Sequence, residues 1–333
     1  MKIRILVITP VKHISGVQKT LESIGDVSYY DDPDEDTVKE IIEDYDVIFT
    51  NPNKSKVFIG QNILEIAKRL KVICTASTGT NHIDKEYASR KKIKILSLTE
   101  ERDVITRISS TAELAFALTL SSIRHINKSF NSVLNGEWDY EKFIGRQMNA
   151  LTVGSIGYGR LGKMYVEYCK AFNANVIVYD PYKNVEDKKI LQVNNLDDLL
   201  TKCDVIAIHV HVTKETIGMI NKNCFDKMKT DVVLINTSRG DMVNEQDLID
   251  FLKSNKKARI ATDVLADEIT NRLNSPLLKF AHESDQVIIT PHIGGMCIEA
   301  QEIAYGHATN MLSNYCKGID NGGGTGIRTL EGD

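Results

Sequence analysis

The chain has 333 residues, of which 42% are hydrophobic and 26% are charged, as in ordinary soluble globular proteins. This length suits two domains, or one domain inserted into another. The formal net charge of −4 offers no basic surface for nucleic acid or an anionic membrane, so neither is expected as a partner.

The cysteines and the start of the chain indicate a cytoplasmic protein. The six cysteines contain no C-x-x-C pair and no Cys/His cluster with zinc spacing, so neither a metal site nor a disulfide framework is expected. Scattered cysteines fit a reducing cytosol. Met1–Arg4 runs directly into the apolar Ile5–Ile8, which predicts a first strand rather than an export signal. The apolar window 114–120 is far shorter than the roughly 20 residues that span a bilayer.

Residues 1 to about 100 alternate short β-branched runs with helical patterns, which is typical of βα units and a parallel sheet. The predicted strands are Ile3–Ile8, Val27–Tyr30, Val47–Thr50, Val72–Thr75 and Ile93–Ser97. The predicted helices lie near 15–24, 35–44, 60–70 and 83–91. This alternation favours a small flavodoxin-like layer.

A long helical pattern follows. Ser109–Thr111 can cap it, Glu113 supplies early negative charge, and apolar residues recur to about Leu134. Trp138 and Tyr140 come next, and this region is expected to pack between domains or between subunits.

A second alternating stretch contains near-continuous apolar strands, as expected for strands that helices cover on both faces. The predicted strands are Leu151–Ile156, Asn175–Tyr179, Val205–His209, Val232–Asn236, Arg259–Val264 and Val287–Thr290. A last helical pattern runs from Ile298 to about Cys316 and is expected to return to the first domain.

A glycine motif lies between the first two of these strands. Gly157-Tyr158-Gly159-Arg160-Leu161-Gly162 matches G-x-G-x-x-G, which alone is a weak signal and also occurs as a structural turn without a ligand. Here it follows a predicted strand and opens a helical pattern. Glycines at these places let the backbone approach a pyrophosphate, which rests on the helix N-terminus.

The cofactor that this motif favours is NAD. Asp180 stands 18 residues after Gly162, at the end of the next predicted strand. Its carboxylate can accept hydrogen bonds from ribose hydroxyls and would repel a 2′-phosphate. Lys183 is the one nearby residue that could argue for NADP instead.

Together these features predict an α/β protein in which a Rossmann dinucleotide-binding domain is inserted into a flavodoxin-like substrate domain. The expected limits are 103–295 for the inserted domain, 1–102 and 296–318 for the substrate domain, and a disordered tail at 319–333.

Three polar residues follow the last three predicted strands. Arg239, Glu268 and His292 each stand where ligands gather in such sheets, at the carboxyl ends of the strands. Any one alone could be a surface ion-pair, helix-start or turn residue, but three in one topological position are harder to dismiss. Hydride reduction of a 2-keto acid needs a cation that holds the carboxylate and polarises the ketone, and a general acid for its oxygen. Arg and His meet these needs, and a neighbouring Glu would orient the imidazole and favour its protonated form.

Over roughly residues 40–316 the chain resembles the D-isomer-specific 2-hydroxyacid dehydrogenase family. The matching segments are Val153–Gly162, His209–Thr216, Asn236–Gly240, Asp263–Glu268 and Thr290–Gly295. The resemblance implies that Arg239, Glu268 and His292 form the catalytic set. It also implies that Asp263 contacts the nicotinamide side of NAD, and it places His209 and Thr237 in the cofactor site.

The same resemblance implies a homodimer formed through the long helical segment. Two positions depart from the family pattern, because His211 and Ile269 stand where the family usually has proline. We expect the extra imidazole of His211 to be tolerated rather than catalytic.

The sequence contains fewer indications of the substrate. Cys74–Thr80 resembles the family loop whose backbone N–H groups grip the substrate carboxylate, so Ser77, Thr78 and Gly79 are expected to bind substrate together with Arg239 and His292. Asn51–Lys56 is expected to face the same cleft. Its cations, Lys54 and Lys56, fit a phosphorylated or polyhydroxylated acid, and fit a solvated loop equally well. A second hypothesis is an NAD-sensing, corepressor-like interaction protein with the same fold, against which the intact Arg, Glu and His argue only weakly.

Overall fold

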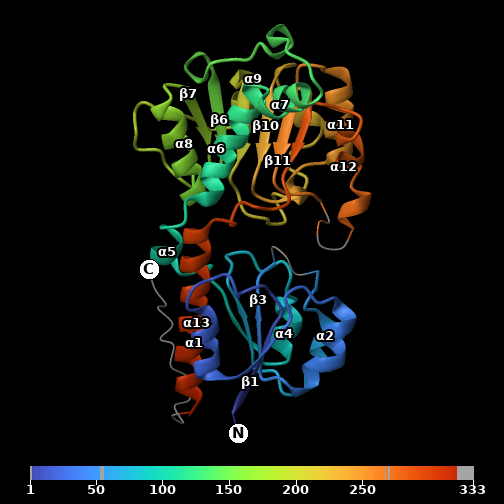
Figure 1. The fold of residues 1–333 in the computed structure, drawn as a ribbon. Helices are drawn as coiled ribbons and strands as arrows, with labels where there is room; N and C mark the ends of the chain where they lie inside the picture. Colours follow the sequence, from blue (N-terminus) through green and yellow to red (C-terminus); the bar gives the residue numbers. More distant parts are fainter. Residues whose placement is uncertain (1, 53–55, 267, 269–270, 321–333) are drawn as a thin grey trace. The chain divides into compact units, whose positions relative to one another are not determined.

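The computed structural model describes residues 2–52, 56–266, 268 and 271–320. Backbone contacts divide the chain into two compact units (Figure 1). The first, called here the discontinuous unit, comprises Met1–Ile108 and Cys297–Asp333, and the second, the inserted unit, is Ser109–Met296.

The discontinuous unit contains a five-stranded parallel sheet in the order β2-β1-β3-β4-β5. Its strands are β1 (Ile3–Val7), β2 (Gly25–Tyr29), β3 (Val47–Thr50), β4 (Val72–Thr75) and β5 (Lys94–Leu96). This order is that of flavodoxin-like sheets, so the fold predicted for this part is confirmed. The central strand β3 is fully buried, because helices cover both faces of the sheet.

The helices that lie between β2 and β5 along the chain cover one face of this sheet. The first and last helices of the chain cover the other face. The first group is α2 (Glu35–Ile41), η1 (Ile42–Asp44), α3 (Gln61–Leu64) and α4 (Lys85–Arg90), and the second is α1 (Val17–Ile24) and α13 (Ile298–Asp320). Leu21 of α1 and Leu312 of α13 share one core cluster, and the two helices lie side by side in Figure 1.

The last helix, α13, lies in the discontinuous unit and is longer than the sequence predicts. It reaches Asp320 and so includes the first residues of the predicted tail, while the rest of that tail lies outside the described residues. The Tyr305 hydroxyl meets Thr9 Oγ1 at 3.2 Å, and His307 Nε2 meets Glu101 Oε2 at 2.8 Å. Glu101 precedes the short helix α5 (Arg102–Ile105).

The inserted unit contains a seven-stranded parallel sheet in the order β12-β11-β10-β9-β6-β7-β8. Its strands are β6 (Thr152–Ile156), β7 (Asn175–Tyr179), β8 (Leu191–Val193), β9 (Val205–Ile208), β10 (Val233–Asn236), β11 (Arg259–Thr262) and β12 (Val287–Ile289). This is the doubly wound dinucleotide-binding order with one further strand, which confirms the predicted fold. The edge strand β8 was not predicted, since Leu-Gln-Val is too short to give a periodic signal.

Helices cover both faces of this sheet as well. One face packs against α6 (Ser110–Ile123) and α8 (Arg160–Ala171), and the other against α9 (Leu196–Lys202), α10 (Lys222–Phe225), α11 (Glu245–Ser254) and α12 (Pro276–Ala281). Short 3₁₀ turns occur at η2 (Tyr140–Phe143), η3 (Met148–Ala150), η4 (Gly240–Met242) and η5 (Arg272–Asn274).

The long helical pattern predicted to run to Leu134 is not one continuous helix. It breaks after α6, and α7 (Ile126–Leu134) begins beyond His125, which has a left-handed φ of 55°. The carbonyl oxygen of Ile123 accepts the backbone N–H of Arg146 at 2.9 Å, so the incoming loop takes an acceptor that a further helical turn would use.

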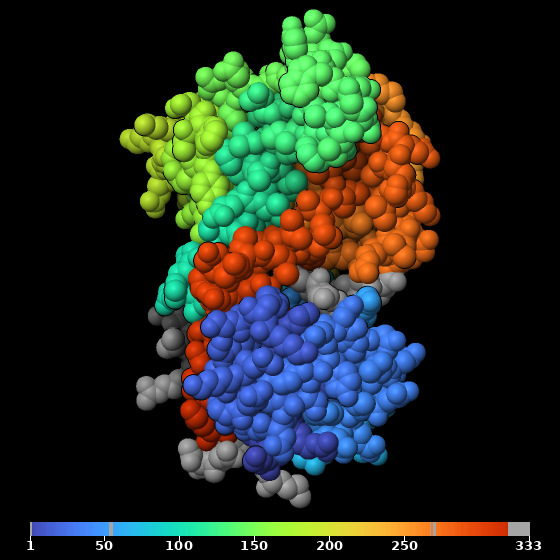
Figure 2. Space-filling model, viewed as in Figure 1, coloured from blue at the N-terminus to red at the C-terminus, as the bar shows by residue number. Residues whose placement is uncertain are grey.

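The segment after the break exposes large apolar side chains. Trp138 is 89% exposed and Tyr140 is 81% exposed, and this stretch, green at the top of Figure 2, protrudes from the inserted unit. The other exposed apolar side chains here are Ile126, Phe130, Val133, Leu134 and Ile144. We call this set the α7 surface.

The two ends of the inserted unit meet. Thr111 Oγ1, at the start of α6, donates to the carbonyl oxygen of Gly294 at 3.1 Å. The chain therefore begins and ends this unit at nearly the same place. None of the described helices is long and apolar enough to cross a membrane.

Candidate active site

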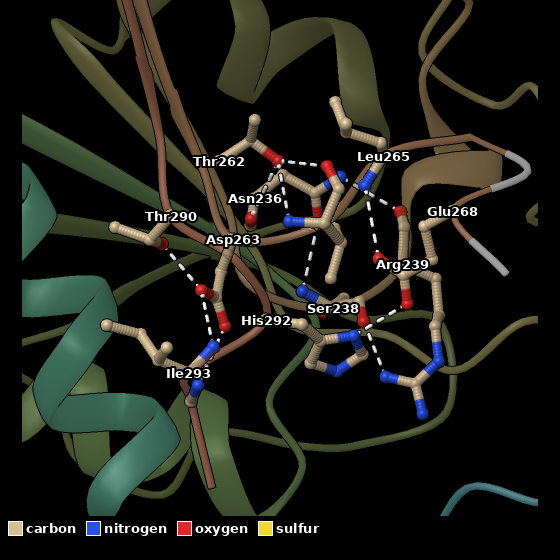
Figure 3. A network of polar contacts seen from close by, with 12 residues as sticks. Asn236, Ser238, Arg239, Thr262, Asp263, Leu265, Glu268, Thr290, His292 and Ile293 are labelled. Carbon is tan, nitrogen blue, oxygen red and sulfur yellow. Dashed lines mark hydrogen bonds and ion pairs between the residues drawn. The ribbon is translucent and has the colours of Figure 1, made fainter. Parts of the chain in front are cut away.

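Three neighbouring strands bring Arg239, Glu268 and His292 to one edge of the inserted unit's sheet. β10, β11 and β12 lie next to one another and run parallel, so their carboxyl ends meet at the same edge. Arg239 follows β10, Glu268 follows β11 and His292 follows β12. Figure 3 shows the three side chains together, with the His292 imidazole directed at the Glu268 carboxylate.

His292 and Glu268 form a close pair. Nδ1 of His292 lies 2.6 Å from Oε1 of Glu268, and the side chains are 20% and 21% exposed. The other carboxylate oxygen of Glu268 accepts the backbone N–H of Leu265 at 3.3 Å. With Nδ1 engaged, Nε2 is the ring atom left to exchange a proton with another molecule.

The surroundings keep Glu268 ionised. Burial by itself would raise the pKa of its carboxyl group, but other effects outweigh it. The hydrogen bond and charge of His292, the Leu265 amide and the charge of Arg239 together hold this pKa below its usual value. A negative Glu268 can therefore stabilise a protonated imidazole at its side.

Arg239 is fixed at the other end of the group. Its Nη1 donates to the Ser238 carbonyl oxygen at 2.6 Å, and its own carbonyl oxygen accepts Asn236 Nδ2 at 2.9 Å. Burial lowers the pKa of the guanidinium, while the charges of Glu268 and Asp241 oppose that shift. Arginine stays charged in proteins, so a half-buried cation remains for an anionic ligand. Asn236 was not predicted as a site residue, although its place just before Thr237-Ser238-Arg239 was an available signal.

Asp263 holds the loop that carries His292. Its carboxylate accepts the Thr290 hydroxyl at 2.5 Å and the N–H groups of Ile293 and Gly294, each at 2.8 Å. The N–H of His292 donates to the Asp263 carbonyl oxygen at 3.0 Å. The carboxylate that the family resemblance assigns to the nicotinamide side is thus engaged with its own chain here.

The glycine motif forms a tight turn between β6 and α8. Gly157 has a φ of 98°, and a Cβ built there would lie 2.6 Å from the His209 carbonyl oxygen, so only glycine fits. Gly159 caps α8 without any side-chain hydrogen bond, and a Cβ added to it would meet nothing within 4 Å. No acidic side chain occupies the first turn of α8. A helix N-terminus whose amides have no side-chain acceptor, and which lies beside open space, fits a pyrophosphate.

Asp180 lies beside this turn, at the end of β7. Its Oδ2 accepts the backbone N–H of Tyr158 at 2.7 Å, and its Oδ1 accepts those of Tyr182 and Lys183 at 2.8 and 3.0 Å. Three backbone amides therefore fix the carboxylate next to the glycine motif, as binding to an adenosine ribose requires.

The polar side-chain atoms of His209 and Thr237 are buried. The His209 ring packs against Tyr165, with centroids 4.9 Å apart, and both ring nitrogens are buried without a hydrogen-bond partner. Burial lowers the pKa of His209 to about 4. Thr237 Oγ1 is likewise buried and unpartnered. In this conformation any contact with a cofactor would come from other atoms of these two residues.

The predicted substrate loop belongs to the discontinuous unit. Ser77 Oγ bridges Thr75 Oγ1 at 2.8 Å and the Gly79 carbonyl oxygen at 2.7 Å, while the Thr78 carbonyl oxygen accepts Thr99 Oγ1 at 2.8 Å. Side chains thus brace the loop from within.

In the neighbouring loop, Lys56 pairs with Asp32 at 3.0 Å, whereas Lys54 lies outside the described residues. Of the two departures from the family pattern, His211 is exposed with its carbonyl oxygen bonded to Thr216, and Ile269 lies outside the described residues.

Residues 116–294 match the profile of the D-isomer specific 2-hydroxyacid dehydrogenase family, NAD binding domain. The match covers more than half of the chain, which therefore belongs to the D-isomer-specific 2-hydroxyacid dehydrogenase family. The family and the cofactor, NAD, are those that the sequence predicts.

The proteins to which the chain is similar have several different activities. It is 33% identical over 305 residues to D-3-phosphoglycerate dehydrogenase of Methanocaldococcus jannaschii, covering 91% of this chain and 55% of the relative. It is 33% identical over 269 residues to hydroxypyruvate reductase of Thermotoga maritima, covering 80% and 84%. Among solved structures, D-lactate dehydrogenase from Aquifex aeolicus with NAD and lactic acid has a TM-score of 0.79 at 29% identity, covering 96% of both chains. The chain spans about half the length of the phosphoglycerate dehydrogenases it matches, 46% and 55% in two of them.

Proposed function

We propose that this protein is an NAD-dependent oxidoreductase that interconverts a small 2-keto acid and its D-2-hydroxy acid. The observation that carries the proposal is the His292–Glu268 pair at 2.6 Å, at the same sheet edge as the half-buried cation Arg239 and in the same unit as an open glycine turn. The similar proteins reported above are dehydrogenases and reductases of such acids, which supports the same class of reaction.

The three side chains have different roles in the proposed reduction. Arg239 binds the substrate carboxylate and polarises the ketone. Bound NADH supplies the hydride that reduces the ketone carbon. The protonated His292 gives the Nε2 proton to the ketone oxygen, and Glu268 keeps the ring oriented and stabilises its charge. The balance is 2-keto acid, NADH and one proton giving 2-hydroxy acid and NAD⁺.

The cofactor would be held by the glycine motif and Asp180. The amides at the start of α8 would bind the pyrophosphate, and the Asp180 carboxylate would accept hydrogen bonds from the adenosine ribose hydroxyls. The residues proposed here are Gly157, Tyr158, Gly159, Arg160, Leu161, Gly162 and Asp180, with His209, Thr237 and Asp263 as further candidates from the family resemblance.

The test is oxidation of NADH with a panel of glyoxylate, hydroxypyruvate, pyruvate and 3-phosphohydroxypyruvate. At least one acid should be reduced, and Arg239→Ala should remove that activity. His292→Ala should abolish turnover while NADH still binds, because the residue acts on the substrate proton. If no acid is reduced above the Arg239→Ala background, the proposed function is wrong.

We further propose that the discontinuous unit binds the substrate carboxylate through the 77–79 loop, that the inserted unit is the catalytic NAD domain, and that the protein acts in the cytoplasm. The loop assignment rests on the family resemblance and on its internally braced backbone. Ser77→Ala should raise KM for the acid and leave NADH affinity unchanged.

A homodimer formed through the α7 surface completes the proposal. Its support is the exposed apolar group led by Trp138 and Tyr140, since monomers rarely expose contiguous apolar patches of this kind. Sedimentation should give a dimer, and Trp138→Ser with Tyr140→Ser should give monomers.

The alternative, an NAD-sensing interaction protein, is not favoured, because the similar proteins reported above are named for dehydrogenase and reductase activities. NAD binding without turnover of any acid would instead support the NAD-sensing alternative.

A further inference from the structure

Glu245 is a buried carboxylate outside the set described so far. It is the first residue of α11 and only 8% exposed. An acidic residue suits a helix start, where Asn244 caps α11 by accepting the N–H of Asp247 at 3.0 Å. A helix start does not require burial, however, and a carboxylate is buried only when its oxygens are paired.

Both oxygens of Glu245 are paired, and with two separate segments. Oε1 accepts the backbone N–H of Ala266 at 3.1 Å. Oε2 accepts the Ser275 hydroxyl at 2.8 Å and the N–H of Leu277 at 3.2 Å. Ser275 in turn caps α12 by accepting the N–H of Leu278 at 3.1 Å. One side chain therefore joins the start of α11, the start of α12 and the chain just after β11.

These contacts lie on either side of Glu268 in the sequence. Ala266 comes shortly before it and Ser275 shortly after it. The backbone at Ala266 is also confined from another direction, because a Cβ built on Gly240 would lie 2.0 Å from the Leu265 carbonyl carbon and 2.2 Å from the Ala266 nitrogen. Leu265 itself donates its N–H to Glu268 Oε2.

We propose that Glu245 is a positioning residue that holds both ends of the segment carrying Glu268 and so keeps Glu268 paired with His292. Without it, the Ala266 and Leu277 amides and the Ser275 hydroxyl lose their acceptor, and the two ends keep only the apolar packing of Leu265 and Leu277 in one core cluster. The consequence for turnover rests on the proposed function, while the effect on the His292–Glu268 pair does not.

The first experiment reads the pair without any substrate. NMR of histidine-labelled protein, assigned with His292→Gln, follows the titration of the His292 imidazole in wild type, Glu245→Ala, Glu245→Gln and Glu268→Gln. Glu268→Gln removes the anionic partner and moves the titration to lower pH. Glu245→Ala should move it in the same direction. Glu245→Gln, which keeps one acceptor oxygen, should move it less and serves if the alanine variant fails to fold.

The matched control is Asp247→Asn, the same acid-to-amide change two residues further along α11. Asp247 is half-buried and accepts the N–H of Lys222 at 2.9 Å, and none of its contacts involves Glu268 or its segment. In Asp247→Asn, the His292 imidazole should titrate as it does in the wild type. If neither Glu245 variant moves the His292 titration, the proposal is overturned.

The second experiment is a double-mutant cycle on turnover. Glu245→Gln should lower kcat with little change in NADH affinity, and the double variant with Glu268→Gln should be no slower than Glu268→Gln alone, because both act on one pair. Misplacement of a catalytic group by about 1 Å costs roughly 100-fold, which bounds the expected loss. Additive losses would contradict the proposal. Absence of turnover in the wild type would reject the proposed function and leave the NMR result to decide this one.

Discussion

The N–H of His292 donates to the carbonyl oxygen of Asp263 at 3.0 Å. The Asp263 carboxylate accepts the backbone N–H groups of the two residues that follow His292. His292 itself has a φ of 56°, in the left-handed region that a residue with a side chain occupies at a cost of about 1 kcal/mol. Asp263 therefore supplies the hydrogen bonds that keep His292 in a backbone conformation it would otherwise leave.

The first prediction separates two roles of Asp263. Asp263→Asn replaces one acceptor oxygen by an NH₂ group that faces a backbone N–H, so the His292 loop should relax. We expect kcat to fall by roughly 100-fold, the scale for a misplaced catalytic group, with little change in NADH affinity. Steady-state kinetics and NADH fluorescence titration measure the two effects. An equal loss of NADH affinity would instead support a direct contact with the nicotinamide side.

The second prediction concerns the pH dependence of reduction. Reduction needs protonated His292, and the charged groups around it are Glu268 at 2.6 Å, Asp263 and, through Glu268, Arg239. Glu268→Gln removes the nearest negative charge, so the imidazolium loses its proton more easily. The pH above which kcat for reduction falls should therefore move lower. The pH profile of kcat in wild type and variant checks it, and an unchanged profile would reject the pairing.

The third prediction concerns cofactor choice. Asp180→Ala removes the acceptor beside the glycine motif and the charge that repels a 2′-phosphate. NADH affinity should fall about tenfold, as expected for one or two lost hydrogen bonds, and discrimination against NADPH should shrink. Lys183→Ala keeps the backbone N–H contact with Asp180, so this variant should bind NADH as the wild type does and serves as the control for NADH affinity alone. Equal cofactor preference in wild type and Asp180→Ala would contradict the assignment.

The fourth prediction concerns stability in acid. Burial lowers the pKa of folded His209 to about 4, while an unfolded histidine titrates near 6.5. The folded-state pKa lies below the unfolded one, so the stability is fully present above about pH 6.5 and is lost as the pH falls toward 4. Urea unfolding midpoints at pH 7.5 and pH 5 should differ more in wild type than in His209→Asn. Equal differences would show that other groups cause the acid lability.

The sequence predicts the fold because the signals for it are local. Continuous apolar runs such as Val205–Ile208 mark buried parallel strands, and the glycine motif marks the first turn of the nucleotide-binding sheet. The positions of Arg239 and His292 follow from the same logic, since strand ends in a parallel sheet share an edge. The pairing of His292 with Glu268 is a contact between loops, which the chemistry of a general acid predicts and for which the structure supplies the atoms and the distance.

What the sequence missed depends on contacts between distant residues. The break at His125 arises because a loop amide, that of Arg146, takes the carbonyl oxygen of Ile123, and no helical periodicity encodes this. Glu245 looks like an ordinary helix-start acid in the sequence, and its partners lie 21 and 30 residues away. The family resemblance placed Asp263 near the cofactor, whereas its loop-holding contacts required the three-dimensional arrangement.

The hydrogen bond from Thr111 to Gly294 has a consequence for how the protein can be taken apart. Because the inserted unit starts and stops at one spot, residues 109–296 form a single contiguous polypeptide that contains the glycine motif and the whole Arg239–Glu268–His292 set. An excision at these two points, with a short linker that joins Ile108 to Cys297 in the remainder, would divide the proposed site between two polypeptides. One would carry the glycine motif and the three polar side chains, and the other the 77–79 loop, so the contribution of that loop could be tested without point substitutions.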